Sequence, residues 1–261
     1  MPIRVVGIDG DDTLWHNETR FHLTQTALRD LLRRHVPDAD VDAHLAEVEM
    51  RNLGLYGYGV KAFTLSMIET AIEVTDRRIP AADLEVILGW GQKMLGEPTE
   101  LLEGVVEALH ELGPSYELLL ITKGDLFDQE SKLARSGLGE LFAGVEILSE
   151  KNEPAYRSVL KRRGIDPKEF VMVGNSLRSD IAPVVAIGAR GVHIPYPLTW
   201  QHEQVPEDSI PSQGWHRLAS IGELGALLAS IGTHAGGVNR HELQSRPDRK
   251  TKRESGPLSS G

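Results

Sequence analysis

The apolar residues of this chain follow two different periods, and the change between them divides the sequence. Residues 3–8 form a short, largely β-branched run that ends at a group of acidic residues, which is typical of a buried strand. From residue 21 to residue 95, apolar residues instead recur at helical spacing, as at Leu28, Leu31 and Leu32. This long block is therefore predicted to be helical almost throughout.

Beyond the helical block, strands and helices alternate. The predicted strands cover residues 117–122, 145–148, 169–173 and 191–194, and the predicted helices cover residues 101–112, 125–136, 154–163 and 179–187. Such alternation is typical of βαβ units with parallel strands. We therefore expect an α/β fold: a Rossmann-like parallel sheet flanked by helices, with an all-helical cap domain inserted after the first strand.

These patterns divide the chain into three parts. We expect a discontinuous α/β core at residues 1–20 and 97–234, and a helical cap at residues 21–96. Residues 235–261 hold few apolar side chains and carry a charge of +3, so they are predicted to form a disordered basic tail. A tail of this charge could bind nucleic acid or a membrane surface, and the sequence leaves that alternative open.

Composition excludes several classes of protein. The net charge is −10, which leaves −13 on residues 1–234 and argues against nucleic-acid binding by the folded part. The chain has no cysteine, so a disulfide, a thiolate zinc site and a cysteine nucleophile are excluded. No apolar run is long enough to span a membrane. We expect a cytoplasmic protein without membrane contact, and its oligomeric state stays open.

Polar residues gather where the predicted strands end. The groups are Asp9-Gly10-Asp11-Asp12-Thr13, Thr122-Lys123-Gly124-Asp125, Ser149-Glu150-Lys151 and Gly174-Asn175-Ser176 with Asp180. Ligands of open parallel sheets bind at the carboxyl ends of the strands. Each group alone could be turn or helix-capping chemistry. Together they offer the oxygen ligands that Mg²⁺ prefers, and the hydroxyls and lysines that bind phosphate.

In this order, the four groups resemble the motifs of the haloacid dehalogenase (HAD) superfamily, and of its phosphatase branch in particular. The first motif, a hydrophobic strand followed by Asp-x-Asp-x-Thr, matches residues 5–14, and the second, a strand ending in Ser or Thr, matches residues 119–122. The third motif, a lysine before a helix, matches Lys151. The fourth, acids after the next strand, matches residues 173–176 and Asp180. The wide gap between the first two motifs fits a helical cap inserted after the first strand.

The resemblance implies a Mg²⁺-dependent phosphatase that hydrolyses a small phosphomonoester, a small phosphorylated metabolite, through an aspartyl-phosphate. Asp9 would be the nucleophile, and Asp11 would protonate the leaving alcohol and then activate water. Mg²⁺ would be held by Asp9, Asp11 and Asp180. Thr122, Lys123 and Lys151 would bind the phosphate, with Thr122 and Lys151 counted among the catalytic residues.

Two positions depart from the phosphatase pattern. Asp12 stands where these phosphatases usually have glycine, and its extra charge could affect metal affinity or only the surface. Asn175 stands where the fourth motif often has Asp. An amide brings no charge but can bind a metal-bound water through its carbonyl, so Asn175 is expected to contact the metal indirectly.

Other branches of the superfamily remain as alternatives. Relatives that cleave carbon–halogen bonds lack the second acid, so Asp11 argues against that chemistry. Phosphonate-cleaving relatives use a cap lysine, and Lys61 keeps that alternative open. A phosphomutase, or a relative that only binds a phosphorylated ligand, would share the core motifs.

The helical block is expected to select the substrate, because the core motifs handle only the phosphate. The glycine-rich segment 51–61 is the main candidate, with Tyr56 and Tyr58 to stack on a ring and Arg51 or Lys61 to meet a second anion. An equally simple interpretation is a helix connection. Two further segments are expected near the site: Trp15, His16 and Glu18 as residues that control access, and the loop 195–204, with Tyr196, Trp200 and His202, as one that docks near the cap.

Overall fold

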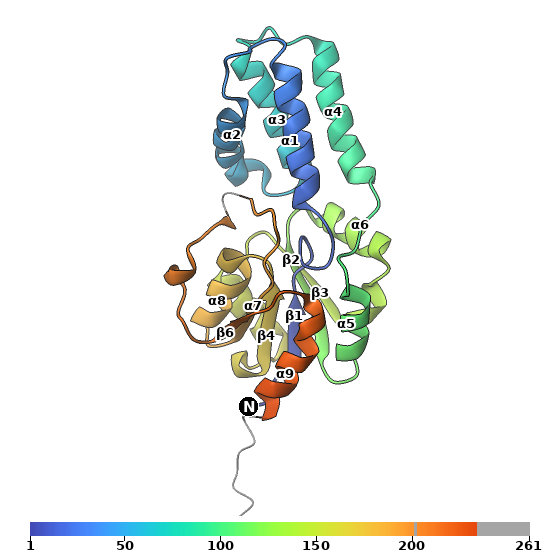
Figure 1. Ribbon diagram of the computed structural model, residues 1–261, viewed down its shortest axis with the longest axis vertical. Coiled ribbons are helices and arrows are strands. Elements are labelled where there is room, and N and C mark those ends of the chain that lie inside the picture. The colour runs from blue at the N-terminus through green and yellow to red at the C-terminus, as the bar shows by residue number, and fades with distance from the viewer. Residues whose placement is uncertain (201–202, 234–261) are drawn as a thin grey trace, which may run out of the picture.

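The computed structural model describes residues 1–200 and 203–233. The described chain has two parts, an α/β body that contains both ends of the described segment and four helices that stand on one end of that body (Figure 1). The predicted tail at residues 235–261 and the predicted docking residue His202 lie outside the described residues.

Within the described residues, six parallel strands form one sheet in the order β3-β2-β1-β4-β5-β6. The strands are β1 (Val5–Ile8), β2 (Glu117–Lys123), β3 (Gly144–Leu148), β4 (Phe170–Gly174), β5 (Arg190–His193) and β6 (Trp215–Arg217). Since β1 lies between β2 and β4, the acidic segment that follows it emerges at the middle of the sheet.

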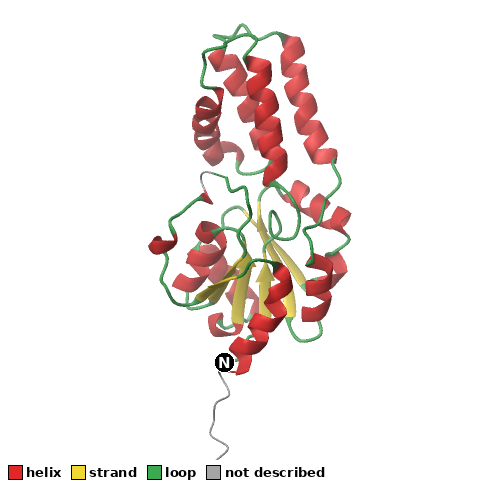
Figure 2. Ribbon diagram, viewed as in Figure 1, coloured by secondary structure: helices red, strands yellow, loops and turns green. Residues whose placement is uncertain are grey.

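Helices cover both faces of the sheet (Figure 2). One face packs against α5 (Val105–Leu112), α6 (Leu126–Ser136) and α9 (Leu224–Thr233), and the other against α7 (Glu153–Arg163) and α8 (Ala182–Ala186). Alternate residues of β1 serve the two faces: Val6 and Ile8 belong to the first apolar cluster and Val5 to the second. The predicted α/β class and Rossmann-like sheet are confirmed.

The remaining helices form a unit with its own apolar core. This four-helix unit comprises α1 (Glu18–Leu32), α2 (Val41–Tyr56), α3 (Val60–Val74) and α4 (Ala81–Gly96). Its core is built from leucines of α1 and α2 and from Phe63, Met67 and Ile87 of α3 and α4. Because this cluster shares no residue with the clusters that flank the sheet, the unit is packed separately from the α/β body.

The structure differs from the predicted elements mainly at the ends and in the C-terminal third. The strand β6 and the helix α9 were not predicted, since three residues of strand and a short apolar helix give weak periodic signals. The predicted helix 179–187 is a π-turn at Leu177–Ile181 followed by the short α8, which contains Pro183 near its start. The predicted helix 101–112 begins only at Val105, after Gly104 in left-handed conformation. Among the described helices, none has the length and apolar character needed to cross a bilayer.

Candidate active site

The segments that follow β1, β3 and β4 bring three charged side chains together at the carboxyl end of the sheet. The Lys151 Nζ lies 2.5 Å from Asp9 Oδ1 and 2.7 Å from Asp180 Oδ1. All three side chains are buried. Gly174 makes this approach possible, because a Cβ at that position would lie 2.2 Å from Asp180 Oδ2. The structure therefore brings together three residues that are far apart in the sequence.

The two carboxylates are incompletely neutralised by the single lysine. Burial raises the pKa of Asp9 to about 7; the Lys151 charge opposes that shift and the charge of Asp180 adds to it. Thr13 Oγ1 donates a hydrogen bond to Asp9 Oδ2 over 3.1 Å, and the Ser176 N–H donates one to Asp180 Oδ2 over 3.0 Å. The two carboxylates carry one more negative charge than Lys151 neutralises, so a further cation beside them would be favourable.

Asp11 lies in a cage of hydrogen-bond donors. Its carboxylate accepts from Trp15 Nε1 at 2.6 Å, from Gln129 Nε2 at 2.9 Å and from Lys132 Nζ at 3.0 and 3.1 Å. Burial raises the pKa of Asp11, but the charge of Lys132 and these hydrogen bonds outweigh burial and lower it overall. Asp11 is thus held as a carboxylate, in one orientation.

Asp12 has a structural explanation. Its φ is +61°, in the left-handed region that favours glycine and that Asp tolerates better than most residues. Its carboxylate accepts hydrogen bonds from the backbone N–H groups of Asn17 and Glu18, so it caps the first turn of α1. This cap starts α1 at Glu18, three residues before the predicted helical block. Burial, with the charge of Asp11, raises the pKa of Asp12 to about 8.

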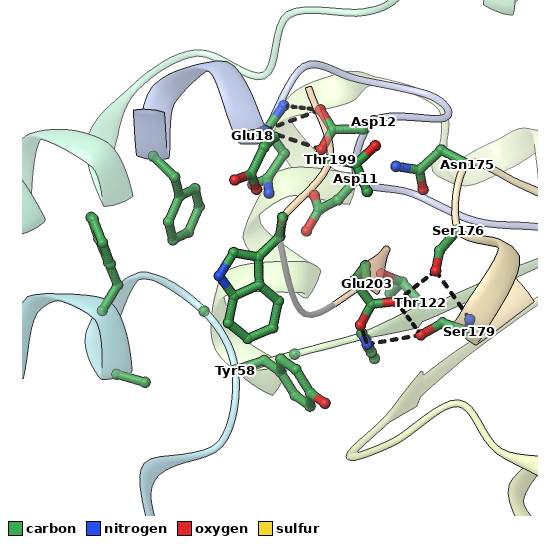
Figure 3. Close-up of a pocket in the computed structure, with 18 of the residues that line it drawn as sticks. Asp11, Asp12, Glu18, Tyr58, Thr122, Asn175, Ser176, Ser179, Thr199 and Glu203 are labelled. Atoms are coloured by element: carbon green, nitrogen blue, oxygen red, sulfur yellow. Dashed lines mark hydrogen bonds and ion pairs between the residues drawn. The ribbon is translucent and has the colours of Figure 1, made fainter. Parts of the chain in front are cut away.

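A second polar group lies at the end of β2. Lys123 Nζ donates to Ser179 Oγ over 2.9 Å and forms an ion pair with Glu203, whose carboxylate also accepts from Ser176 and Ser179 (Figure 3). Thr122 lies next to this group with its hydroxyl donating to Gln129. Thr122 and Lys123, two of the three residues predicted to bind phosphate, therefore lie at the carboxyl end of β2.

These groups line one cavity between the carboxyl end of the sheet and the four-helix unit. Its volume is about 1200 Å³, including the solvent at its mouth. Its floor includes Asp9, Asp11, Thr122, Lys151 and Asp180, and Asn175 and Lys123 also border it. The core residues predicted from the sequence thus share one cavity. The size of this cavity suits a small ligand.

The segment predicted to select the substrate is only partly at the cavity. Tyr58 borders it, with its hydroxyl donating to Glu150 over 2.6 Å and its ring 4.3 Å from Lys123 Nζ. Tyr56 is half exposed and does not border the cavity. Arg51 and Lys61 do not border it either, because each pairs with a carboxylate elsewhere.

The residues predicted to control access differ in role. Trp15 is fully buried and holds Asp11, so it belongs to the core rather than to an entrance. His16 Nδ1 lies 2.7 Å from the hydroxyl of Tyr196, which is also 2.8 Å from Thr19 Oγ1 of α1. The loop that follows β5 therefore contacts the four-helix unit, and its Trp200 meets Tyr58 edge to face.

Comparisons with known proteins agree with this architecture. The family described as haloacid dehalogenase-like hydrolases matches residues 3–188. The crystal structure of a haloacid dehalogenase-like family hydrolase from Xanthomonas campestris is 40% identical, covers 90% of this chain and 94% of its own, and superposes with a TM-score of 0.81. The chain belongs to the haloacid dehalogenase-like hydrolases.

More distant HAD structures share the fold but differ in their described activities. A 2-haloacid dehalogenase from Pseudomonas syringae pv. Tomato is 21% identical, with a TM-score of 0.58 over 88% of this chain and 99% of its own. A protein described as a predicted phosphoglycolate phosphatase from Haemophilus somnus is 16% identical, with the same TM-score over 86% and 97%. No curated protein sequence matches the chain. The comparisons establish a HAD-like hydrolase. They do not distinguish cleavage of a carbon–halogen bond from cleavage of a phosphate ester, so that distinction depends on the chemistry of the site.

Sequence patterns missed the α6 side of this HAD site. The buried residues of α6 are all polar, namely Asp128, Gln129 and Lys132, whereas Leu126 and Phe127 are exposed. Lys132 Nζ lies between Asp11 and Asp128 and also donates to Asn17. In α6 the apolar residues are exposed and polar residues four apart face the interior, which is the reverse of an ordinary amphipathic helix. This reversed pattern could have indicated a polar site next to α6.

The donor set fits a divalent cation of the magnesium type. Asp9 and Asp180 contact the same Lys151 Nζ, so two carboxylates share one cation, and Asn175 lines the same cavity with its amide (Figure 3). Within residues 1–200 and 203–233, no three acidic or histidine side chains converge as a complete metal cluster. Two carboxylates and an amide suit Mg²⁺, because that ion binds oxygen ligands and usually keeps several waters.

Proposed function

We propose that this HAD-like hydrolase is a Mg²⁺-dependent phosphatase that hydrolyses a small phosphomonoester through an aspartyl-phosphate. The observation that carries the proposal is Asp11, a second carboxylate beside Asp9 that three side chains hold in one orientation. Cleavage of an ester releases an alkoxide that needs a proton, whereas cleavage of a carbon–halogen bond releases a halide that needs none.

Asp9 is the proposed nucleophile. Its carboxylate oxygen attacks the phosphorus, a phosphorus–oxygen bond forms, and the bond to the substrate's alcohol oxygen breaks. Asp11 gives the alkoxide its proton, then takes a proton from the water that hydrolyses the aspartyl-phosphate. The Lys132 charge keeps Asp11 ionised without substrate, the form that acts on water. The negative charge of an incoming phosphoryl group opposes that effect and favours the protonated form needed first.

The remaining core residues stabilise the phosphoryl group. Lys151 neutralises Asp9 and the transferring phosphoryl oxygens, and Thr122 and Lys123 bind those oxygens from the end of β2. Asp9, Asp180 and a backbone carbonyl at Asp11 would hold Mg²⁺, with Asn175 on a coordinated water. When bound, the ion supplies charge that offsets the repulsion between the two anions that react.

The four-helix unit is the proposed cap over this site. Tyr58 reaches from the cap to Glu150, and Lys61 Nζ reaches Asp125 Oδ1 over 2.8 Å. Lys61 is thereby engaged away from the cavity, which favours ester cleavage over the Schiff-base chemistry of phosphonate-cleaving relatives.

Phosphate release from p-nitrophenyl phosphate tests the proposal. We expect turnover with Mg²⁺, loss of turnover with a chelator, and recovery when Mg²⁺ is restored. Asp9→Asn should abolish turnover while its circular dichroism and melting temperature stay close to those of the wild type. The exposed Asp38→Asn serves as the matched control. Halide release from 2-chloropropionate, without phosphate release at any Mg²⁺ concentration, would instead assign the enzyme to the dehalogenases.

A further inference from the structure

The cavity wall opposite the phosphate-binding floor is formed by the four-helix unit. Glu18 and Phe21 of α1, Glu49 and Asn52 of α2, and Phe63 and Ser66 of α3 line it. This wall faces the part of a substrate that the core residues do not bind. Its chemistry therefore bears on the organic group of the substrate.

Two carboxylates on this wall have no partner in the described structure. The side chains of Glu18 and Glu49 form no hydrogen bond or ion pair with any residue in 1–200 or 203–233. Burial raises the pKa of each to about 7; the charges of Asp11 and Glu203 add to the shift at Glu18, and the charge of Glu18 adds to that at Glu49. Both residues are partly buried, and a partly buried carboxylate without a cation is unfavourable, so a pair of them in a cavity needs an explanation.

Asn52 adds a third acceptor to the same wall. It is 3% exposed, and its Nδ2 donates to Ser66 Oγ over 3.2 Å and to Glu69 Oε2 over 2.6 Å. These two bonds fix the orientation of the amide, because only its nitrogen can donate. Its Oδ1 accepts no hydrogen bond from the described residues, and Asn52 lines the cavity. The wall thus presents two carboxylates and an amide oxygen that accept no hydrogen bond from the described residues.

The cations of this region are turned away from the wall. Arg51 Nη2 lies 2.8 Å from Glu69 Oε1 and 2.7 Å from Glu73 Oε1, on the outside of the four-helix unit. Lys61 is paired with Asp125. Among the described residues that line the cavity, the cations are Lys123, Lys132 and Lys151, all at the phosphate end and all paired with core carboxylates. A substrate with a second anion would therefore find no counter-charge on this wall.

We propose that the wall formed by Glu18, Glu49 and Asn52 binds a protonated amine, so that the substrate is a small phosphomonoester with an ammonium group on its organic part. The ammonium has three donors and no acceptor, which complements two carboxylates and an amide oxygen. Phe21 and Phe63, which line the same cavity, supply an apolar, aromatic surface for the carbon skeleton and for a cation. This inference rests on the proposed phosphatase function.

Matched pairs of compounds that differ only by amine or hydroxyl test the inference. The pairs are 2-aminoethyl phosphate with 2-hydroxyethyl phosphate, and glucosamine 6-phosphate with glucose 6-phosphate. For each pair, calorimetry gives the ratio of dissociation constants, and phosphate release gives the ratio of kcat/KM. We expect at least one pair to favour the amine at least tenfold in both ratios at pH 8, where both carboxylates are ionised and hydrogen bonds between charged groups are strong.

Variants show where the preference arises. Glu49→Gln and Glu18→Gln should each reduce the amine-to-hydroxyl ratio at least fivefold. Glu47→Gln, the same substitution on an exposed residue of α2, should leave the ratio and the activity as in the wild type. Ratios near one for both pairs would overturn the inference and show that the wall does not distinguish an amine from a hydroxyl. A preference for the amine that survives both Gln variants would also overturn it, because the amine would then be bound elsewhere.

The two proposals fail in different ways. Tighter binding of the amine that depends on Glu49, without phosphate release from any compound, would refute the phosphatase and support the amine-binding wall. Phosphate release from p-nitrophenyl phosphate and from both members of each pair at equal efficiency would support the phosphatase and refute the amine-binding wall.

Discussion

Lys132 is the buried cation whose removal is most informative. It is 7% exposed, and its ammonium contacts Asp11 at 3.0 Å, Asp128 at 3.4 Å and the Asn17 amide oxygen at 2.9 Å. Lys132→Met keeps most of the aliphatic volume and removes the charge. Two carboxylates are then left without their cation in a largely buried site.

The expected loss follows from the cost of breaking a buried ion pair. Removing one partner of such a pair costs about 3–5 kcal/mol, because an uncompensated charge stays buried. For a chain of this size, each kcal/mol lowers the melting temperature by about 2–4 °C, so we expect a loss of roughly 6–20 °C at pH 8. The loss should shrink towards pH 4, because the unpaired carboxylates then take up protons.

Urea denaturation at pH 8 and pH 4, with melting curves, measures this effect. The matched control is Lys93→Met, the same substitution in an exposed ion pair with Glu97, which should cost less than about 0.5 kcal/mol. Asp128→Asn added to Lys132→Met should recover part of the loss and keeps the test informative if the single variant unfolds. A loss below about 1 kcal/mol for Lys132→Met, equal at both pH values, would refute the assignment of Lys132 as the cation that neutralises Asp11.

Three further outcomes are expected. Asp12→Ala removes the cap of α1 and leaves a non-glycine residue at positive φ. The free energy of unfolding, measured by urea titration, should therefore fall by about 1–2 kcal/mol. An unchanged free energy would show that the cap does not stabilise α1. Gly174→Ala should abolish phosphate release, because its Cβ would displace Asp180; wild-type kinetics would contradict the close approach of the two residues. The pKa of about 7 for Glu18 and for Glu49 lies above that of an ordinary Glu, so the folded state binds more protons than the unfolded state between about pH 4.5 and pH 7. The stability that these protonated groups contribute is complete below pH 4.5 and is lost as the pH rises through 7, so unfolding free energies at pH 5 and pH 8 should differ less in the double Gln variant than in the wild type.

The fold was predictable because its signals are local. A strand of β-branched residues ending at Asp9, and helices that end at glycine, need only neighbouring residues to be recognised. In a parallel sheet every strand delivers its carboxyl end to the same edge. Residues that follow different strands, such as Asp9 and Asp180, therefore meet without any further information from the sequence.

Other features required tertiary packing. Lys132 and Asp11 are 121 residues apart, and their contact depends on which face of α6 turns towards the strand ends. Arg51 was expected to meet a substrate anion, but two acids one turn apart on α3, Glu69 and Glu73, hold it on the outside of the four-helix unit. Such competition between possible ion pairs is decided by geometry, which residue type and spacing do not encode.

The sequence by itself thus determined the α/β alternation, the inserted helices and the set of residues at the strand ends, because periodicity and parallel topology are sufficient for these. Only the tertiary structure decided which charges neutralise one another and which stay unpaired. That distinction matters for Glu18 and Glu49, two ordinary acids in the sequence that become unpartnered carboxylates only when α1 and α2 close one side of the cavity. The physical reason is that the energy of a charge depends on burial and on neighbours within a few ångströms, and both are properties of the packed chain.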